Sequence, residues 1–383
     1  MPALVCEVCA ERTEPASLAW RCACGGMFSI EPVRTGLTFT AAARERNSLW
    51  RYESVLPVPF DAGISLGEGQ SPMVASRTRP GGRYKLDFLM PTLSFKDRGA
   101  VVLATLAARL GVRSALVDSS GNAGTAAAAY FARAGIPCRV FVPASTSPGK
   151  LAQMRAHGAD VTLVPGTRAD TSAATLVAAQ APGVFYASHA FHPYFVHGVK
   201  TYGYEVWEQS GRELPATVIV PVGNGTLLLG CYLAFRELLD AGLAARMPRL
   251  VAVQTIACPP LATAFAARSD VAASVVAGPT VAEGIAITAP SRGPQILAAV
   301  AETGGTIVSV TDDEVLTARA ELAMQGLFVE PTSAVCRAAL TVATTTGTAE
   351  LADRGWTWSI ARDALLADDV IIPLCGAGLK APG

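Results

Sequence analysis

Three segments of this 383-residue chain share one pattern, in which an apolar, strand-like run passes through a turn into a helical run. The first turn carries Lys96 between the apolar run 84–90 and the helical pattern 101–110. The other two turns, 119–124 and 223–226, contain glycine. Such turns place backbone N–H groups at a helix N-terminus, where the helix dipole adds to their attraction for an anion. Together, the three units predict a pocket for an anionic ligand.

Strand and helix patterns alternate from Lys96 to about Glu205 and again from Val218 to the C-terminus. Alternation with short turns favours parallel sheets covered by helices, and the chain is long enough for two domains with sizeable cores. We therefore predict an α/β fold with two domains built on open, twisted, mainly parallel sheets, plus a small N-terminal cysteine ribbon. The predicted boundaries are 1–35 for the ribbon, 36–95 with 206–383 for the large domain, and 96–205 for the small, mobile domain.

The charge and hydropathy of the chain exclude several classes of partner. Formal charges balance, with 31 basic and 31 acidic residues. No basic run is long enough to follow a phosphate backbone, so no nucleic-acid partner is expected. No run of about 18 apolar residues predicts a membrane span, and residues 1–10 lack the basic start and apolar segment of a signal peptide. We therefore expect a cytoplasmic protein.

Four of the nine cysteines cluster near the N-terminus, where Cys6 and Cys9 are followed by Cys22 and Cys24. Four thiolates can hold zinc in a closed, tetrahedral structural site. The second pair is one residue tighter than the usual spacing, and the alternative is a ribbon that keeps its thiols without metal. The other five cysteines are scattered singly along the chain, which suits reduced thiols in a cytosolic protein.

In this order and at these spacings, the motifs resemble the fold-type II family of pyridoxal-phosphate enzymes, and most closely the threonine synthases. The stretch 65–72 resembles a family turn that lies near the substrate. The resemblance implies a pyridoxal 5'-phosphate cofactor in the large domain, a small-molecule amino-acid substrate in the small domain and, by analogy, a homodimer. It runs through nearly the whole chain and rests on the segments 65–72, 94–99, 120–124, 223–226, 282–285, 330–334 and 374–380.

By this resemblance, Lys96 is the catalytic residue and the Schiff-base partner of the cofactor aldehyde. An amine is nucleophilic only in its neutral form, and partial burial beside other cationic groups lowers the pKa of a lysine toward that form. After the substrate amine displaces it, the freed lysine can move protons at the substrate carbons.

The resemblance also implies the remaining contacts of the cofactor and substrate. The amide of Asn122 is expected at the cofactor's ring oxygen. Contacts to the cofactor phosphate are expected from Gly223, Asn224, Gly225 and Thr226. Contacts to the substrate carboxylate are expected from Ser119, Ser120, Gly121 and Ala123. The alternative for this second loop is a simple helix cap by Ser120 or Asn122.

Cys375 is a first departure from the family pattern. The threonine synthases generally have a threonine here, whose hydroxyl bonds the pyridine nitrogen of the cofactor, and a thiol is only a weak donor in the same place. A neutral partner leaves that nitrogen unprotonated and weakens the ring as an electron sink. The thiol of Cys375 is expected to weaken the contact further.

The run 192–201 is a second departure. The family commonly has an asparagine and an arginine on the substrate phosphate here, and His192 and Phe195 take their places, which removes the bidentate anion clamp. His192 is our candidate substrate ligand. Together with His189 and His197, His192 can bind an anion or serve as an acid or base near neutral pH. The alternatives are a metal site and a polar rim packed around Phe191, Tyr194 and Phe195.

These residues predict a pyridoxal-phosphate-dependent lyase of the threonine synthase type, which acts on an amino acid by elimination and hydration. The leading substrate is O-phosphohomoserine, with threonine and phosphate as products. The alternative enzyme performs β-elimination or β-replacement on threonine, serine or an activated serine, and the altered run with Phe195 favours it. A third hypothesis is a non-catalytic scaffold that binds a partner. A dinucleotide fingerprint is absent from the sequence.

Overall fold

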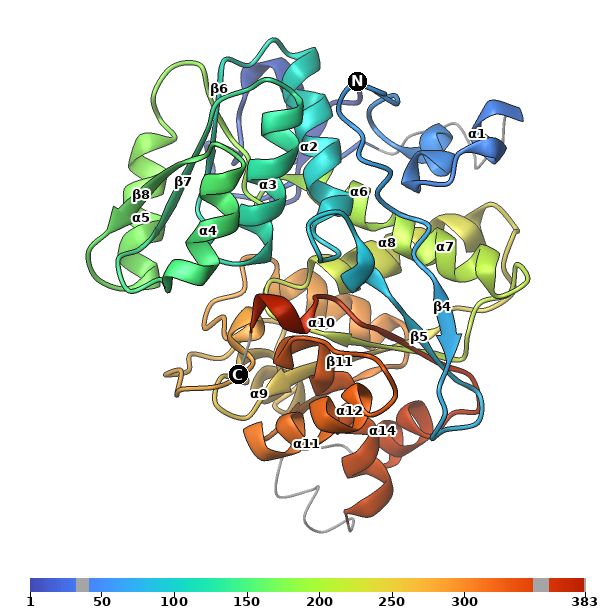
Figure 1. Ribbon diagram of the computed structural model, residues 1–383. Helices are drawn as coiled ribbons and strands as arrows, with labels where there is room; N and C mark the ends of the chain where they lie inside the picture. Colours follow the sequence, from blue (N-terminus) through green and yellow to red (C-terminus); the bar gives the residue numbers. More distant parts are fainter. Residues whose placement is uncertain (32–40, 347–357, 382–383) are drawn as a thin grey trace. The chain divides into compact units, whose positions relative to one another are not determined.

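The computed structural model describes residues 1–31, 41–346 and 358–381 (Figure 1). The chain divides into two compact units. The first unit comprises Met1–Gln70 and Met90–Thr201, and the second comprises Ser71–Leu89 and Tyr202–Gly383. The chain therefore passes between the units three times. Within the described ranges, none of the helices has the length and apolar character that a membrane span requires.

The first unit contains two sheets. A three-stranded antiparallel sheet, in the order β2-β1-β3, carries the N-terminal cysteines. A four-stranded parallel sheet has the order β8-β7-β6-β9. The strands are β1 (Leu4–Cys6), β2 (Arg12–Thr13), β3 (Phe28–Ile30), β6 (Ser114–Val117), β7 (Cys138–Pro143), β8 (Asp160–Val164) and β9 (Val184–Tyr186).

The helices of the first unit connect these strands. The longer ones are α2 (Asp97–Arg109), α3 (Asn122–Arg133), α4 (Pro148–Ala156), α5 (Arg168–Ala178) and α6 (Pro193–Val199), and the shorter ones are η1 (Pro15–Ser17), α1 (Ala41–Glu45) and η2 (Leu49–Val55). A capping box starts α5, because the side chains of Thr167 and Asp170 each accept a backbone N–H of the other residue. The alanine-rich α3 buries nearly all of its length, since small side chains allow close helix packing.

The second unit is built on a six-stranded sheet in the order β12-β11-β10-β13-β5-β4, parallel except for the edge strand β4. Its strands are β4 (Met73–Ala75), β5 (Gly82–Lys85), β10 (Thr217–Pro221), β11 (Arg249–Thr255), β12 (Thr306–Val310) and β13 (Val370–Pro373). Every residue of β10 is buried, which explains its continuous apolar sequence.

The helices of the second unit are α8 (Thr226–Asp240), α9 (Pro260–Ala266), α10 (Gly293–Glu302), α11 (Asp312–Ala323), α12 (Pro331–Thr345) and α14 (Trp358–Leu365), with the short turns η3 (Asp87–Leu89), η4 (Glu283–Ile285) and η5 (Gly378–Lys380). The helix α7 (Thr201–Gln209) begins at the third crossing of the chain. The core of this unit packs Ile219, Val251 and Val308 of the sheet together with Ala334 and Ala338 of α12.

The predicted α/β fold with mainly parallel sheets and an N-terminal cysteine-bearing sheet is confirmed. The unit limits differ from the predicted domain limits, because the described part of 36–70 groups with the first unit. A physical reason is the fully buried carboxylate of Glu68, which accepts hydrogen bonds from Trp50 Nε1 (2.8 Å) and from the Tyr130 hydroxyl on α3 (3.0 Å). The functions predicted for the two large domains stay predictions.

Candidate active site

Lys96 immediately precedes α2 in the first unit and is half-buried. Its carbonyl accepts the backbone N–H of Gly99 (3.2 Å) and of Ala100 (3.0 Å), so it belongs to the first helical turn. Its ammonium group lies 4.3 Å from the ring centroid of Phe95 and 5.8 Å from that of Phe195. The Lys96 side chain therefore lies beside two aromatic rings at a helix N-terminus.

The residues beside Lys96 are buried and fixed by hydrogen bonds. The carboxylate of Asp97 accepts the backbone N–H of Thr92 (2.7 Å) and also its hydroxyl. The guanidinium of Arg98 donates to the Thr201 hydroxyl (3.1 Å). Both Asp97 and Arg98 are completely buried. These bonds hold the first turn of α2 and thereby the backbone of Lys96.

The loop Ser119–Ala123, predicted to bind the substrate carboxylate, follows β6 and leads into α3. The N–H of Gly121 donates to the Ser119 hydroxyl (3.3 Å). Gly121 is the N-cap residue, so neither Ser120 nor Asn122 holds the N-cap position of this helix. Glycine has no side chain to accept the first N–H groups, and a helix N-terminus suits an anion.

Asp118 lies directly before this loop. Burial raises the pKa of its carboxyl to about 6, although the neighbouring Tyr186 hydroxyl and the positive charge of Arg168 act in the opposite direction. Asp118 was not among the predicted site residues. The signal that could have found it is a carboxylate directly after a buried strand.

The three neighbouring histidines are buried in the first unit. Burial, with the positive charges of Lys96 and Arg168, holds the pKa of His189 well below its usual range, so its imidazole is neutral. The ring of His192 lies 5.2 Å from Phe185 and 5.5 Å from Tyr194. This environment matches the predicted packing around aromatic rings, and the substrate contact of His192 stays a prediction.

The predicted phosphate loop of the second unit follows β10 and leads into α8. Gly225 is the N-cap of α8 with φ = 70°, a conformation that favours glycine, and no side chain caps the helix. A Cβ on Gly223 would stand 2.9 Å from Ile287, and one on Gly225 would stand 2.3 Å from Ile296. Only glycine fits both positions, and the first-turn N–H groups of α8 form a cradle that suits a phosphate.

Cys375 lies at the same edge of the sheet, because β13 runs parallel to β10 and pairs Val370 with Thr217. It is almost completely buried. Its N–H and that of Gly376 both donate to the Ser333 hydroxyl, each at 2.9 Å. Ser333 belongs to the motif 330–334, for which no role was predicted. The structure gives it one, which is to fix the backbone of the Cys375 loop.

The motif 282–285 packs against the phosphate loop and against the motif 330–334 within the second unit. The N–H of Gly284 donates to the Thr332 hydroxyl (3.3 Å), and Gly284 leaves no room for a side chain there. The backbone of Ile285 lies where a Cβ on Gly223 would reach it, at 3.0 Å. Four motifs far apart in the sequence therefore meet at the carboxyl edge of one parallel sheet, the edge where α/β folds bind ligands.

The four N-terminal cysteines form one cluster, with all sulfur atoms within 4.8 Å of one another. Cys6 and Cys24 are 3.5 Å apart, and Cys9 and Cys22 are 3.6 Å apart. A tetrahedral zinc site with Zn–S bonds of about 2.3 Å requires sulfur separations of about 3.8 Å. The backbone N–H of Cys9 is the largest influence that lowers the pKa of the Cys6 thiol, to about 6, which favours the thiolate that metals bind. Among the described residues it is the only such cluster of metal-binding side chains, so the three histidines do not form one.

Comparison with known proteins identifies the family. A family model described as pyridoxal-phosphate dependent enzyme matches residues 64–352. The chain belongs to this family. The predicted membership is therefore confirmed, and the matched residues include both the Lys96 turn and the phosphate loop.

Curated relatives of this pyridoxal-phosphate enzyme carry the name threonine synthase. One from Methanosarcina acetivorans is 34% identical over 301 residues, which cover 76% of this chain and 74% of the relative. One from Methanocaldococcus jannaschii is 32% identical and covers 86% of this chain and 84% of the relative. A solved structure, a threonine deaminase from T.th., has a TM-score of 0.64 at 25% identity and covers 80% of this chain and 92% of the other. The protein is thus a pyridoxal-phosphate-dependent lyase of the threonine synthase-like type.

Proposed function

We propose that this enzyme is a threonine synthase that converts O-phosphohomoserine and water into threonine and phosphate. The observation that carries the proposal is the similarity to relatives named threonine synthase over most of the chain. Two groups of predicted site residues support it. Lys96 and the loop 119–123 lie at helix N-termini of the first unit, and the loop 223–226 lies at a helix N-terminus of the second unit.

The cofactor supplies an electron sink for the negative charge that develops at the substrate α-carbon. We propose that Lys96 would hold the cofactor covalently and that its amine would carry the proton removed from that carbon. The cradle of Gly223, Asn224, Gly225 and Thr226 binds the cofactor phosphate through N–H groups and the Thr226 hydroxyl. Its uncapped helix end is the observation that fits this role.

The remaining roles concern orientation. The amide of Asn122 would donate to the ring oxygen of the cofactor, and the thiol of Cys375 would be the partner of its ring nitrogen. Contacts to the substrate carboxylate come from Ser119, Ser120, Gly121 and Ala123. The uncapped N-terminus of α3 supports this last role, since helix dipoles favour anions there.

A second function has one observation in its favour. Phe195 replaces the arginine that the family commonly uses on the substrate phosphate, and it is only 2% exposed. A neutral, buried ring cannot clamp an anion, so elimination from threonine or serine, or β-replacement on an activated serine, is the alternative reaction. The fold likeness to a threonine deaminase agrees with this alternative.

Product analysis separates the two functions. The protein loaded with pyridoxal phosphate is given O-phosphohomoserine, and the released phosphate and amino acid are measured, with Lys96→Ala as the control. Phosphate and threonine that depend on Lys96 support a threonine synthase. A 2-oxo acid from threonine or serine supports the alternative. No turnover of O-phosphohomoserine, despite a borohydride-reducible bond to Lys96, rejects the proposed substrate and retains the cofactor.

We also propose that Cys6, Cys9, Cys22 and Cys24 bind a structural zinc ion, because their sulfur separations suit a tetrahedral site. All nine cysteines are free thiols, which fits a reducing compartment and supports a cytoplasmic location. By analogy with the family we propose a homodimer, which sedimentation velocity tests.

A further inference from the structure

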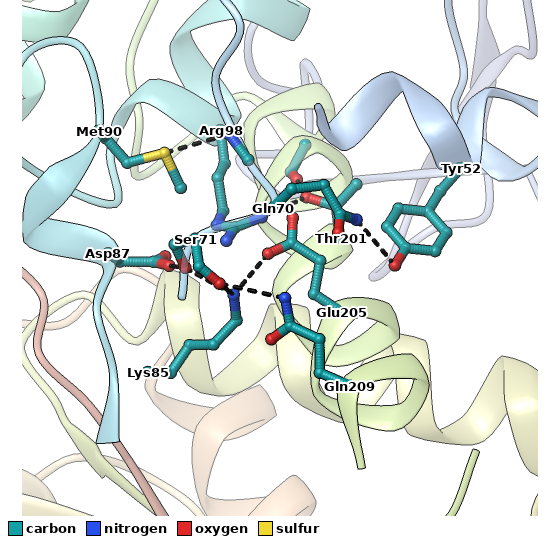
Figure 2. A network of polar contacts seen from close by, with 12 residues as sticks. Tyr52, Gln70, Ser71, Lys85, Asp87, Met90, Arg98, Thr201, Glu205 and Gln209 are labelled. Carbon is teal, nitrogen blue, oxygen red and sulfur yellow. Dashed lines mark hydrogen bonds and ion pairs between the residues drawn. The ribbon is translucent and has the colours of Figure 1, made fainter. Parts of the chain in front are cut away.

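A completely buried lysine ends the strand β5 in the second unit. Lys85 donates to Glu205 Oε2 at 2.7 Å and also to the hydroxyl and the carbonyl of Ser71 (Figure 2). Glu205 is likewise completely buried. The three bonds use all the N–H groups of the ammonium ion, so this charge is satisfied by fixed partners.

Two further side chains complete the group, which we call the Lys85 cluster. The Ser71 hydroxyl donates to Asp87 Oδ1 at 2.6 Å, and Gln209 Nε2 donates to the Ser71 carbonyl at 3.1 Å. Asp87 is completely buried and Ser71 is 4% exposed. The Lys85 cluster therefore comprises Ser71, Lys85, Asp87, Glu205 and Gln209.

The members of the Lys85 cluster lie at all three places where the chain passes between the units. Ser71 is the first residue of the second unit after the first crossing. Asp87 lies two residues before Leu89, where the second crossing begins. Glu205 lies three residues after Tyr202, where the third crossing ends. One buried cation thus joins the three segments at which the chain enters or leaves the second unit.

The Lys85 cluster also connects to the backbone beside Cys375. The N–H of Leu374 donates to the Lys85 carbonyl (2.8 Å), and the N–H of Phe88 donates to the Leu374 carbonyl (2.9 Å). Leu374 directly precedes Cys375, so the backbone around Lys85 fixes the approach to that loop. In the other direction along the chain, the segment that contains Asp87 continues into Lys96.

The same crossings are tied within the first unit by bonds of its own. The N–H of Gly69 donates to the sulfur of Met90 (3.2 Å), which links the segments of the first and second crossings. Thr201, the last residue before the third crossing, accepts from Arg98, two residues after Lys96. Each crossing is therefore held by side-chain bonds, and the third is held next to the predicted catalytic lysine.

A buried ion pair contributes little net stability, because removing two charges from water offsets most of their attraction. What such a pair supplies best is one defined geometry. We propose that the Lys85 cluster positions the part of the cofactor site that belongs to the second unit: it fixes the segment Ser71–Leu89 and the backbone that leads to Cys375, and so sets where Cys375 meets the cofactor, without touching the cofactor itself. This inference rests on the cofactor contact proposed for Cys375.

The test replaces the ion pair by apolar side chains of similar volume, Lys85→Met with Glu205→Leu, so that no single buried charge is left behind. The matched control removes the partly exposed ion pair between Arg83, on the same strand as Lys85, and Asp369, directly before β13, as Arg83→Gln with Asp369→Asn. Both variants are loaded with pyridoxal phosphate. The measurements are the dissociation rate of the cofactor, its visible circular dichroism and hydrogen exchange at the N–H groups of Phe88 and Leu374.

We expect the double variant to fold and to release the cofactor at least about tenfold faster, because a small displacement of the binding groups weakens their contacts with a ligand. We also expect a changed dichroism band of the cofactor and faster hydrogen exchange at both N–H groups. The control keeps the wild-type values. If the double variant does not fold, the same measurements are made on Glu205→Gln, which keeps the side-chain volume, and we expect the same changes. A folded variant with wild-type release, dichroism and exchange overturns the proposal. None of these readouts needs O-phosphohomoserine, so failure of the proposed reaction is distinguished from failure of this inference.

Discussion

The ring of Phe195 on α6 lies directly against Gly99 on α2. A Cβ built on Gly99 would stand 2.5 Å from the nearest ring atoms of Phe195, closer than van der Waals contact allows. Gly99 lies three residues after Lys96, so the residue that departs from the family pattern packs on the first turn of the helix that carries the predicted catalytic lysine. The two helices approach this closely only because glycine has no side chain.

Gly99→Ala is expected to lower the free energy of unfolding by about 1–3 kcal/mol, because the added methyl group overpacks the contact with Phe195. It also displaces the turn that holds Lys96. Urea denaturation measures the effect. Gly149→Ala on α4 is the matched control, since nothing lies within 4 Å of its Cβ. That change is expected to be neutral or stabilising by up to about 1 kcal/mol. Equal effects of the two changes would contradict the close packing.

Ser333→Ala is expected to lower the free energy of unfolding by at least about 2 kcal/mol, because it leaves two buried N–H groups, of Cys375 and Gly376, without their acceptor. We also expect weaker binding of pyridoxal phosphate, which absorbance titration measures. Thr344→Ala on the same helix removes an exposed hydroxyl and should change stability by less than about 0.5 kcal/mol. Unchanged cofactor affinity in a folded Ser333→Ala protein would reject a role for the Cys375 loop in the site.

The fold could be predicted because its signals are local. The strand-turn-helix units around 119–124 and 223–226 show in a few consecutive residues, and continuous apolar runs such as β10 identify buried parallel strands. The same local signals indicated the glycine at the N-cap of α8. Motif order then led to the family that the comparisons confirm.

The parts that could not be predicted depend on partners far away in the sequence. Lys85 ends a short strand, where a lysine normally points into solvent, and its burial depends on Ser71 and on Glu205, which is 120 residues away. The grouping of 41–70 with the first unit depends on Glu68 and Tyr130, which are 62 residues apart. The sequence indicated His192 as a substrate ligand from its position in a motif and offered packing around Tyr194 as the alternative, but its other aromatic neighbour, Phe185 on β9, could not be foreseen.

Purified protein is expected to contain about one zinc ion per chain, which metal analysis by mass spectrometry measures. Cys9→Ser should lose the metal and lower the melting temperature, because the ribbon packs on the rest of the first unit through Trp20, whose ring lies 5.2 Å from both Tyr186 and Phe191. Cys258→Ala, outside the cluster, should keep the metal. Protein with full stability and no bound metal would show that the ribbon keeps its thiols without zinc.

Asp118 gives the stability of the protein a pH dependence of known sign. Its pKa is about 6 in the folded protein and about 3.9 in an unfolded chain. The folded state therefore binds the proton more tightly, and the stability linked to this group is complete below about pH 4 and is lost as the pH rises through about 6. Asp118→Asn removes this loss.

We therefore expect the stability of Asp118→Asn relative to the wild type to increase between about pH 4 and about pH 7 and to stay constant above that range, because an amide does not ionise. Melting temperatures of both proteins across this range measure the difference. Asp160→Asn, an exposed carboxyl at the start of β8, is the control and should follow the wild-type curve. Parallel curves for Asp118→Asn and the wild type would mean that the Asp118 carboxyl ionises as easily in the folded protein as in the unfolded chain, so that burial would not be what sets its charge.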